Sequence, residues 1–246
     1  MIKLIKYEFR KTLFAKLVLL LVTAVAEILF LAGVFAEWDN GVGFGVVGLA
    51  LCAIVGIMYV GIDSLLVFHR DLNTKQSYML FLTPRNSFQI LGAKVLENGI
   101  SIFVAGLFYS ALAFFDFTTA VLHIGGLDEF LEILDSVLHS INIDIDWNRA
   151  FVVFAVMLAS WLMTVVTGYL AIVLCATVLS GKRFSGLVSL IIFVILNWLA
   201  GTVMNHMPGG QEDIMTRFAF VIVAALVIAA IMYVITGWIM EKKLSV

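Results

Sequence analysis

Residues 17–36 read LVLLLVTAVAEILFLAGVFA, a run in which Glu27 is the single charged residue. A helix needs about 20 predominantly apolar residues to cross the hydrocarbon core of a bilayer. This run meets that requirement, and it is too long for the apolar core of a cleavable signal peptide. It therefore predicts a transmembrane helix that the protein retains.

Five further apolar runs follow this one. They cover residues 42–68, 88–121, 150–179, 184–204 and 218–240. The chain is 63% hydrophobic and 13% charged, with a mean hydropathy of +1.10. A soluble domain is about half apolar and about a quarter charged, because its surface needs polar cover. We therefore expect an all-α, polytopic membrane protein with six transmembrane helices, forming a single transmembrane domain over residues 1–246.

The segment before the first run, residues 1–16, has the pattern of an amphipathic helix at the membrane interface. Four apolar residues share one helical face, and three basic residues lie on another. These are Ile2, Ile5, Phe9 and Leu13 on the apolar face and Lys3, Lys6 and Arg10 on the basic face. We expect this segment to lie on the membrane surface as an elbow before the first span.

Two other segments are too polar to cross a membrane. Residues 69–87 (HRDLNTKQSYMLFLTPRNS) connect the second and third runs, and Thr83 is a plausible N-cap for the helix that follows. Residues 122–149 carry apolar residues at helical spacing opposite several acids, which predicts an amphipathic segment outside the membrane. The second run also contains many glycines (Gly43, Gly45, Gly48, Gly56 and Gly61), which allow helices to approach closely in lipid.

The distribution of basic residues predicts the orientation. Cytoplasmic loops of membrane proteins are enriched in lysine and arginine. With a cytoplasmic N-terminus and six crossings, every one of the 15 basic residues except Arg149 and Arg217 faces the cytoplasm. We therefore expect both termini, and residues 69–87, to be cytoplasmic, and residues 122–149 to be extracellular.

The sequence lacks the motifs that an intramembrane enzyme or a nucleotide-binding protein would need. It contains no H-E-x-x-H, no G-x-S-x-G and no G-x-x-x-x-G-K-[ST]. Its net charge of −2 does not indicate nucleic acid as a partner, and Cys52 and Cys175, both in apolar runs, indicate neither a disulfide framework nor a metal site. We expect no enzymatic activity and no cofactor in this chain.

Four polar residues inside or at the edge of the runs are candidates for a pathway or for bonds between helices. Polar groups within the membrane are costly and often functional. Glu27 is the deepest, and both structural bonding and a transport role stay open for it, as they do for Asn197. Asp63 is expected to reach the cytoplasmic edge and pair with Arg70. Glu97 follows Lys94 by three residues and is expected to pair with it on one helix face.

The layout resembles the permease subunits of type-2 ABC transporters, particularly the small bacterial exporters. The resemblance rests on LIKYEFRK (residues 4–11), on RDLNTKQSYMLFLTPRNSFQILGAKVLE (residues 70–97), on six runs with both ends inside, and on EKKL (residues 241–244). The layout covers the whole chain, and the motifs cover about a fifth of it. The central block is the most specific of these features.

The resemblance implies that the cytoplasmic segment of residues 69–87 is a coupling segment that docks onto a separate ATPase. The residues that it implies as ATPase contacts are Arg70, Asp71, Lys75, Gln76 and Tyr78. It also implies two ATPase subunits that bind ATP and magnesium, and a second copy of this chain or a related permease. The location would be a bacterial plasma membrane, in contact with lipid.

We therefore expect an ATP-driven exporter permease that moves a hydrophobic or amphipathic substrate such as a peptide, an antibiotic or a lipid. The sequence does not identify that substrate, and it leaves open a role in export, immunity or sensing. The alternative is a self-sufficient proton-coupled carrier or channel that uses the intramembrane acids. The sequence has no inverted repeat or broken-helix pattern that would favour the alternative.

Overall fold

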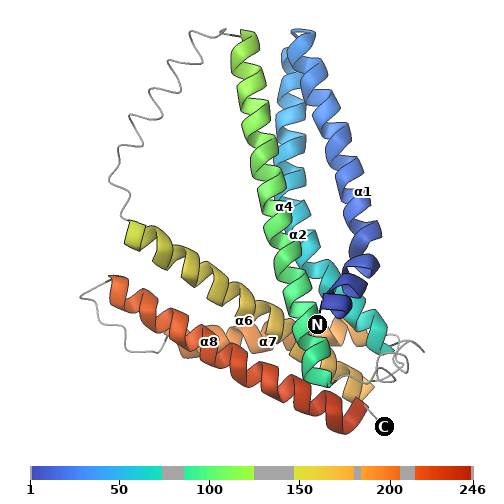
Figure 1. Cartoon of the computed structure of the whole chain (residues 1–246), viewed down its shortest axis with the longest axis vertical. Coiled ribbons are helices and arrows are strands. Elements are labelled where there is room, and N and C mark those ends of the chain that lie inside the picture. The colour runs from blue at the N-terminus through green and yellow to red at the C-terminus, as the bar shows by residue number, and fades with distance from the viewer. Residues whose placement is uncertain (1, 74–85, 125–146, 180–183, 206–213, 245–246) are drawn as a thin grey trace. The chain divides into compact units, whose positions relative to one another are not determined.

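The computed structural model describes residues 2–73, 86–124, 147–179, 184–205 and 214–244, and helices make up nearly all of this part (Figure 1). The elements, in chain order, are α1 (Ile2–Phe35), α2 (Asp39–Asn73), α4 (Ser87–Ile124), α6 (Trp147–Leu179), α7 (Ser185–Asn205), α8 (Ile214–Ile239) and the π-helical turn η1 (Met240–Leu244). Six of these helices are long and apolar enough to cross a membrane. The predicted all-α fold, with six helices able to cross a membrane, is therefore confirmed.

Several helix boundaries differ from those expected. Residues 2–35 form one continuous helix in place of a separate interfacial helix and a span. Within the N-terminal segment the buried side chains are the polar residues Glu8 and Thr12, while Ile2 of the predicted apolar face is 83% exposed. The separate amphipathic elbow is thus not supported. The orientation of the termini stays a prediction.

The polar segments are shorter than the sequence suggested. Helix α2 continues through residues 69–73, and α4 begins at Ser87. The N-cap of α4 is Asn86, whose Oδ1 accepts a hydrogen bond from the Phe88 N–H at 3.2 Å. Thr83, the expected N-cap, lies outside the described residues, as does the part of the predicted outer segment over residues 125–146.

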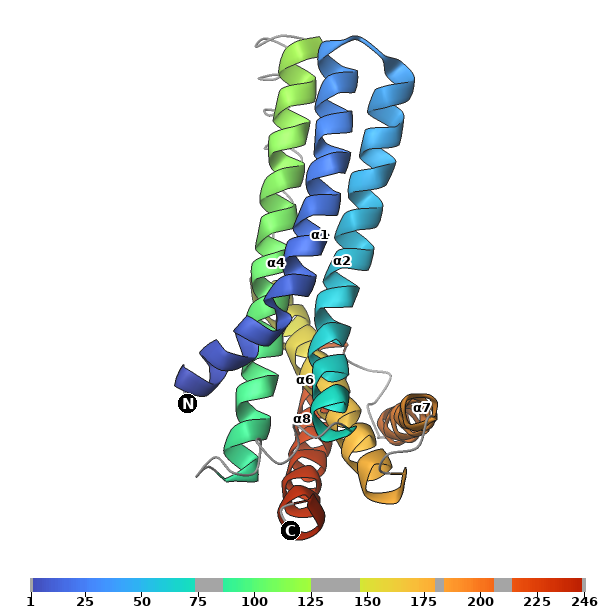
Figure 2. The same ribbon diagram turned by 90° about the vertical axis from the view of Figure 1, so that its right-hand side faces the viewer.

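The described helices divide into two compact units. Unit 1 comprises Met1–Glu8, Ser64–Glu97 and Asp146–Val246, and unit 2 comprises Phe9–Asp63 and Asn98–Ile145. Within unit 2, α1, α2 and α4 run side by side (Figures 1 and 2). Within unit 1, α6 packs against both α7 and α8.

A tight turn joins α1 to α2 in unit 2. Glu37 has a φ of 51°, the left-handed conformation that ends many helices. The Trp38 N–H donates to the Gly33 carbonyl at 2.9 Å, and the Glu37 N–H donates to the Val34 carbonyl at 3.4 Å. These two bonds form a Schellman motif, so the Gly33 and Val34 carbonyls at the end of α1 are satisfied within the turn.

Close contact between helix backbones holds this hairpin together. A Cβ atom added at Gly45 would lie 2.5 Å from the Phe30 Cα, and one added at Gly33 would lie 2.4 Å from the Val42 nitrogen. Farther along, a Cβ at Gly56 would lie 2.6 Å from the Tyr109 hydroxyl oxygen. Gly45 and Gly56 thus allow the close approach between helices that the glycine-rich pattern predicted. A Cβ atom added at Gly43 would meet no atom within 4 Å.

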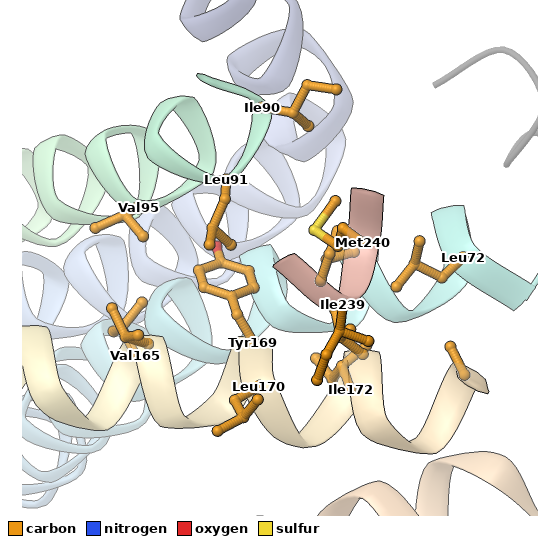
Figure 3. Close-up of a cluster of buried hydrophobic side chains, with 14 residues drawn as sticks. Leu72, Ile90, Leu91, Val95, Val165, Tyr169, Leu170, Ile172, Ile239 and Met240 are labelled. Carbon is orange, nitrogen blue, oxygen red and sulfur yellow. The ribbon is translucent and has the colours of Figure 1, made fainter. Parts of the chain in front are cut away.

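The core of unit 1 forms where the end of α2 and the start of α4 meet α6 and the end of α8 (Figure 3). Tyr169 is fully buried and projects from α6 toward Leu91 of α4. Met240, also fully buried, closes the same cluster from η1. A second, smaller cluster of alanines and Met163 packs α6 against α7 and α8.

Most of the apolar surface of the spans is not covered by protein. Between 11% and 33% of the residues in the most apolar window of each span are buried inside the molecule. The side chains of Phe44, Phe114 and Phe151, for example, are 70%, 67% and 71% exposed. Lipid solvates such side chains without penalty, whereas water does not. These surfaces therefore require a membrane.

The hairpin contact predicts opposite effects at two glycines of α2. Gly45→Ala forces a Cβ onto the Phe30 backbone and should lower the free energy of unfolding by about 1–3 kcal/mol, the usual cost of overpacking. Gly43→Ala meets no atom within 4 Å, so it should leave stability unchanged or raise it by up to about 1 kcal/mol through helix propensity. Unfolding by sodium dodecyl sulfate in mixed micelles, followed by circular dichroism, measures both. Equal effects of the two variants would contradict the packing described.

Candidate functional site

The first three turns of α4 carry charge into the interior of unit 1. Lys94 and Glu97 lie one turn apart on α4, and each is 1% exposed. Ile90 and Leu91, one turn before Lys94, are buried on the same side of the helix. An isolated buried ammonium group would be very costly, so this lysine needs anionic partners.

Lys94 finds these partners on two other helices. Its Nζ lies 2.7 Å from Glu8 Oε2 of α1 and 3.1 Å from Asp71 Oδ2 of α2, and none of the three side chains is more than 4% exposed. An ammonium group has three N–H donors, and two of them are used here. We call Glu8, Asp71 and Lys94 the charged cluster.

Aromatic side chains enclose the charged cluster. The Lys94 Nζ lies 5.2 Å from the centre of the Phe68 ring, within the range of a cation–π contact. Tyr169 packs edge-on against Phe68 with 5.2 Å between ring centres, and its hydroxyl forms a 2.7 Å hydrogen bond with Ser64 Oγ. This wall excludes water from the ion pairs, which strengthens them and raises the cost of breaking them.

The position of the charged cluster along the helices is informative. Helix α2 has 35 residues and α4 has 38, so each is more than about 50 Å long at about 1.5 Å per residue. The hydrocarbon core is only about 30 Å thick, so the excess must project from it or be taken up by tilt. Asp71 lies near the end of α2 and Lys94 near the start of α4, so their ion pair joins the two helix ends that bracket residues 74–85.

The charged cluster includes one of the expected ATPase contacts. Asp71 is 2% exposed and bonds to Lys94, so its carboxylate faces the interior of unit 1, and its contact with an ATPase stays a prediction. Helix α2 continues through this residue. Arg70 is exposed, as a contact residue must be. Lys75, Gln76 and Tyr78 lie outside the described residues.

Glu8 and Lys94 were not singled out from the sequence as site residues. The expected partner of Lys94 was Glu97, three residues away on the same helix, whereas the ion pairs described above reach 86 and 23 residues along the chain. One signal was present: Glu8 is the single acid among the first 16 residues, all others there being basic, polar or apolar. An acid retained in a basic segment indicates a specific partner.

A second acidic site lies within unit 2. The carboxyl groups of Glu27 on α1 and Asp116 on α4 lie next to each other. Glu27 Oε2 and Asp116 Oδ1 are buried atoms with no hydrogen-bond partner among the described residues. Two ionised carboxylates side by side would repel each other, so a shared proton or a nearby cation would stabilise this pair.

Asp116 is an intramembrane acid that was not among the residues predicted from the sequence. It lies within the predicted third run, residues 88–121, and so satisfies the criterion that selected Glu27. Each of the two acids also lies eight residues before the last residue of its helix, Phe35 or Ile124. At about 1.5 Å per residue, the two acids therefore lie at the same distance from the C-terminal ends of α1 and α4. This equal distance would have suggested that the two side chains meet.

The remaining candidates are placed as follows. The Asn197 Nδ2 donates to the Phe193 carbonyl at 3.0 Å, one turn back on α7, so its amide bonds within its own helix. Asp63 is buried in α2 at 8% exposure, and its pairing with Arg70 stays a prediction. Glu97 is buried beside Lys94, as stated above. Among the described residues, no three His, Cys, Asp or Glu side chains are placed to hold a metal ion.

The chain was compared with known protein families, curated proteins and solved structures, and it matches none of them. What the sites can do must therefore be argued from their chemistry.

The burial of Lys94 predicts a large loss of stability when its charge is removed. Lys94→Met leaves the carboxylates of Glu8 and Asp71 buried without this cation, which should cost about 3–5 kcal/mol of unfolding free energy. Lys242→Met is the matched control, because Lys242 is exposed and its Nζ lies over the Trp238 ring, 4.7 Å from the ring centre. It should change the unfolding free energy by about 1 kcal/mol or less. The same detergent titration measures both, and similar losses in the two variants would contradict the role of the charged cluster.

Proposed function

We propose that this chain is the permease subunit of a type-2 ABC exporter in a bacterial plasma membrane. Two separate ATPase subunits would bind ATP and magnesium, and a second copy of the chain or a related permease would complete the pathway. The cargo would be hydrophobic or amphipathic, such as a peptide, an antibiotic or a lipid. Both termini would be cytoplasmic.

The observation that carries this proposal is the ion pair between Asp71 and Lys94. It joins the ends of α2 and α4 that bracket residues 74–85, within the segment that the family resemblance assigns to ATPase docking. Lys94 also holds Glu8 near the start of α1. A force applied to residues 74–85 would therefore act on three helix ends together, because the ion pairs prevent them from moving apart.

In this mechanism the chain transmits movement, and the ATPase subunits carry out the chemical step. ATP binding would draw the two ATPases together, and the docked segments would move with them. The charged cluster would pass this displacement to α1, α2 and α4, which continue from unit 1 into unit 2. A rigid, dry ion cluster suits that task because it resists shear more than apolar contacts do.

A direct test is purification of the tagged chain from its native membrane under mild detergent. We expect a soluble subunit with a phosphate-binding loop to co-purify in stoichiometric amounts, as identified by mass spectrometry. Arg70→Glu, which reverses the exposed charge on the last turns of α2, should reduce its recovery about tenfold, the effect of about 1.4 kcal/mol.

The control is Arg149→Glu, an equal reversal at an exposed arginine that the orientation places outside the cell. It should leave recovery of the ATPase unchanged. Recovery of the chain alone, under conditions that preserve an established ABC complex, would refute the proposal.

A second candidate, a self-sufficient proton-coupled carrier, is favoured by the contact between Glu27 and Asp116. A shared proton within a span is the arrangement that a proton-driven carrier would need. The carrier would require no partner ATPase.

Proton flux into vesicles separates the two candidates. If the permease proposal is correct, the purified chain in liposomes with an imposed pH gradient should give no flux above that of empty vesicles, as read by an internal pH-sensitive dye. The carrier predicts flux that Glu27→Gln and Asp116→Asn each abolish, while Glu37→Gln in the exposed α1–α2 turn does not. Flux with that pattern of variants would replace the proposed function by the carrier.

A further inference from the structure

Helix α2 contains a glycine whose backbone carbonyl has a hydrogen-bond donor on another helix. Gly61 lies within the candidate span Asn40–Leu72, where α2 is continuous. The Nδ2 of Asn98 on α4 donates to the Gly61 carbonyl at 2.7 Å, and Asn98 is 0% exposed. In an α-helix this carbonyl also accepts a bond from the N–H four residues on. A carbonyl oxygen has two lone pairs, so it can accept both bonds.

The second donor lowers the cost of opening α2 at this point. An unsatisfied backbone group is very costly in hydrocarbon, so a spanning helix resists any bend that breaks its ladder of backbone hydrogen bonds. At Gly61 the carbonyl keeps the Asn98 amide as its donor when the bond from the Leu65 N–H opens. That N–H can then bond to the carbonyl of Val60, five residues back, as in a π-bulge. Neither backbone group is left without a partner.

Close packing does not account for the glycine at this position. A Cβ atom added at Gly61 would lie 3.3 Å from the Ile102 Cδ1, the end of a flexible side chain. At Gly45, in contrast, the added atom would meet the backbone of α1. Glycine has the weakest helix preference of any residue except proline, so Gly61 weakens α2 without allowing a closer approach of backbones.

The division between the two compact units crosses α2 two residues after this glycine. Residues up to Asp63 belong to unit 2, and residues from Ser64 onward belong to unit 1. Each part of α2 has packing of its own: Gly45 contacts α1 in unit 2, and Phe68 belongs to the core of unit 1. A helix that is shared by two packed bodies bends where its backbone ladder is weakest.

We infer that α2 has a hinge at Gly61, where the Asn98 amide holds the carbonyl while the following residues change direction. Sharp bends in helices occur where a side chain inserts into the backbone ladder. Asp71, which Lys94 holds, lies ten residues after Gly61, about 15 Å along the helix. That segment is the lever on which a force at residues 74–85 would act. This use of the hinge rests on the proposed function, but the hinge itself does not.

Pulsed electron paramagnetic resonance on the full-length chain in liposomes tests the hinge. Spin labels are attached at Leu21→Cys and Arg70→Cys, two exposed positions, after Cys52 and Cys175 are replaced by alanine. A bend of about 20° at Gly61 moves position 70, nine residues away, by about 5 Å. Because the carbonyl is satisfied in both positions, we expect the labelled parent chain to show a distribution of distances at least that wide.

Two pairs of variants locate the hinge. Gly61→Ala strengthens the ladder and Asn98→Leu removes the second donor, so each should narrow the distribution. Gly48→Ala adds a methyl group to the same helix at an ordinary contact distance, 3.5 Å from the Ala26 Cβ. Asn197→Leu removes an amide that bonds within its own helix. Both of these controls should leave the width unchanged.

Three results would overturn the inference. One is a single narrow distribution in the labelled parent chain. Another is an equal width in the parent chain and Gly61→Ala, which folds whether or not the buried Asn98 can be replaced. The third is narrowing by Gly48→Ala as well, which would show that the general stiffness of α2 sets the width. The measurement needs no ATPase, so the hinge and the proposed function can fail separately.

Discussion

The ammonium group of Lys94 is the contact on which the polar architecture of unit 1 depends. It neutralises carboxylates from two other helices, at 2.7 and 3.1 Å, in surroundings that exclude water. Apolar contacts alone tolerate sliding between helices, because they lack direction. Hydrogen-bonded charges do not, since any displacement leaves a buried charge unsatisfied. The ends of α1, α2 and α4 are therefore held in one register by a single side chain.

The number and type of spans could be predicted from the sequence because they depend on local composition. A run such as residues 150–179 is apolar enough to cross a membrane whatever its neighbours are, and helix α6 forms there. The charged cluster could not be predicted in this way. Lys94 had a partner of opposite charge three residues away, and nothing local shows that Glu8, 86 residues distant, lies closer to its ammonium group in space. The burial of Asp71 could not be predicted for the same reason, because a charged residue near a helix end looks exposed until its partner is known.

The two acidic sites place different demands on the protein. Near the ends of α2 and α4, the carboxylates of Glu8 and Asp71 are matched by a lysine, so their environment is fixed. Among the described residues no cation bonds to Glu27 or Asp116, so this pair would need a proton to offset the repulsion of two carboxylates. The first site therefore suits a structural joint, and the second would suit a group that takes up a proton. A transporter driven by a partner ATPase needs the first kind, and a carrier needs the second.

The Schellman turn at Glu37 has a consequence for how the protein is made. It satisfies the carbonyls at the end of α1 with bonds that lie within the turn itself, and Gly33 and Gly45 let the two helices close without help from later segments. The first two helices can therefore enter the membrane as a finished hairpin. Glu8 and Asp71 are synthesised in that hairpin, while Lys94 follows 23 residues after Asp71. Before Lys94 is synthesised the two carboxylates lack this cation, so the ion pairs can form only after the start of α4 has emerged.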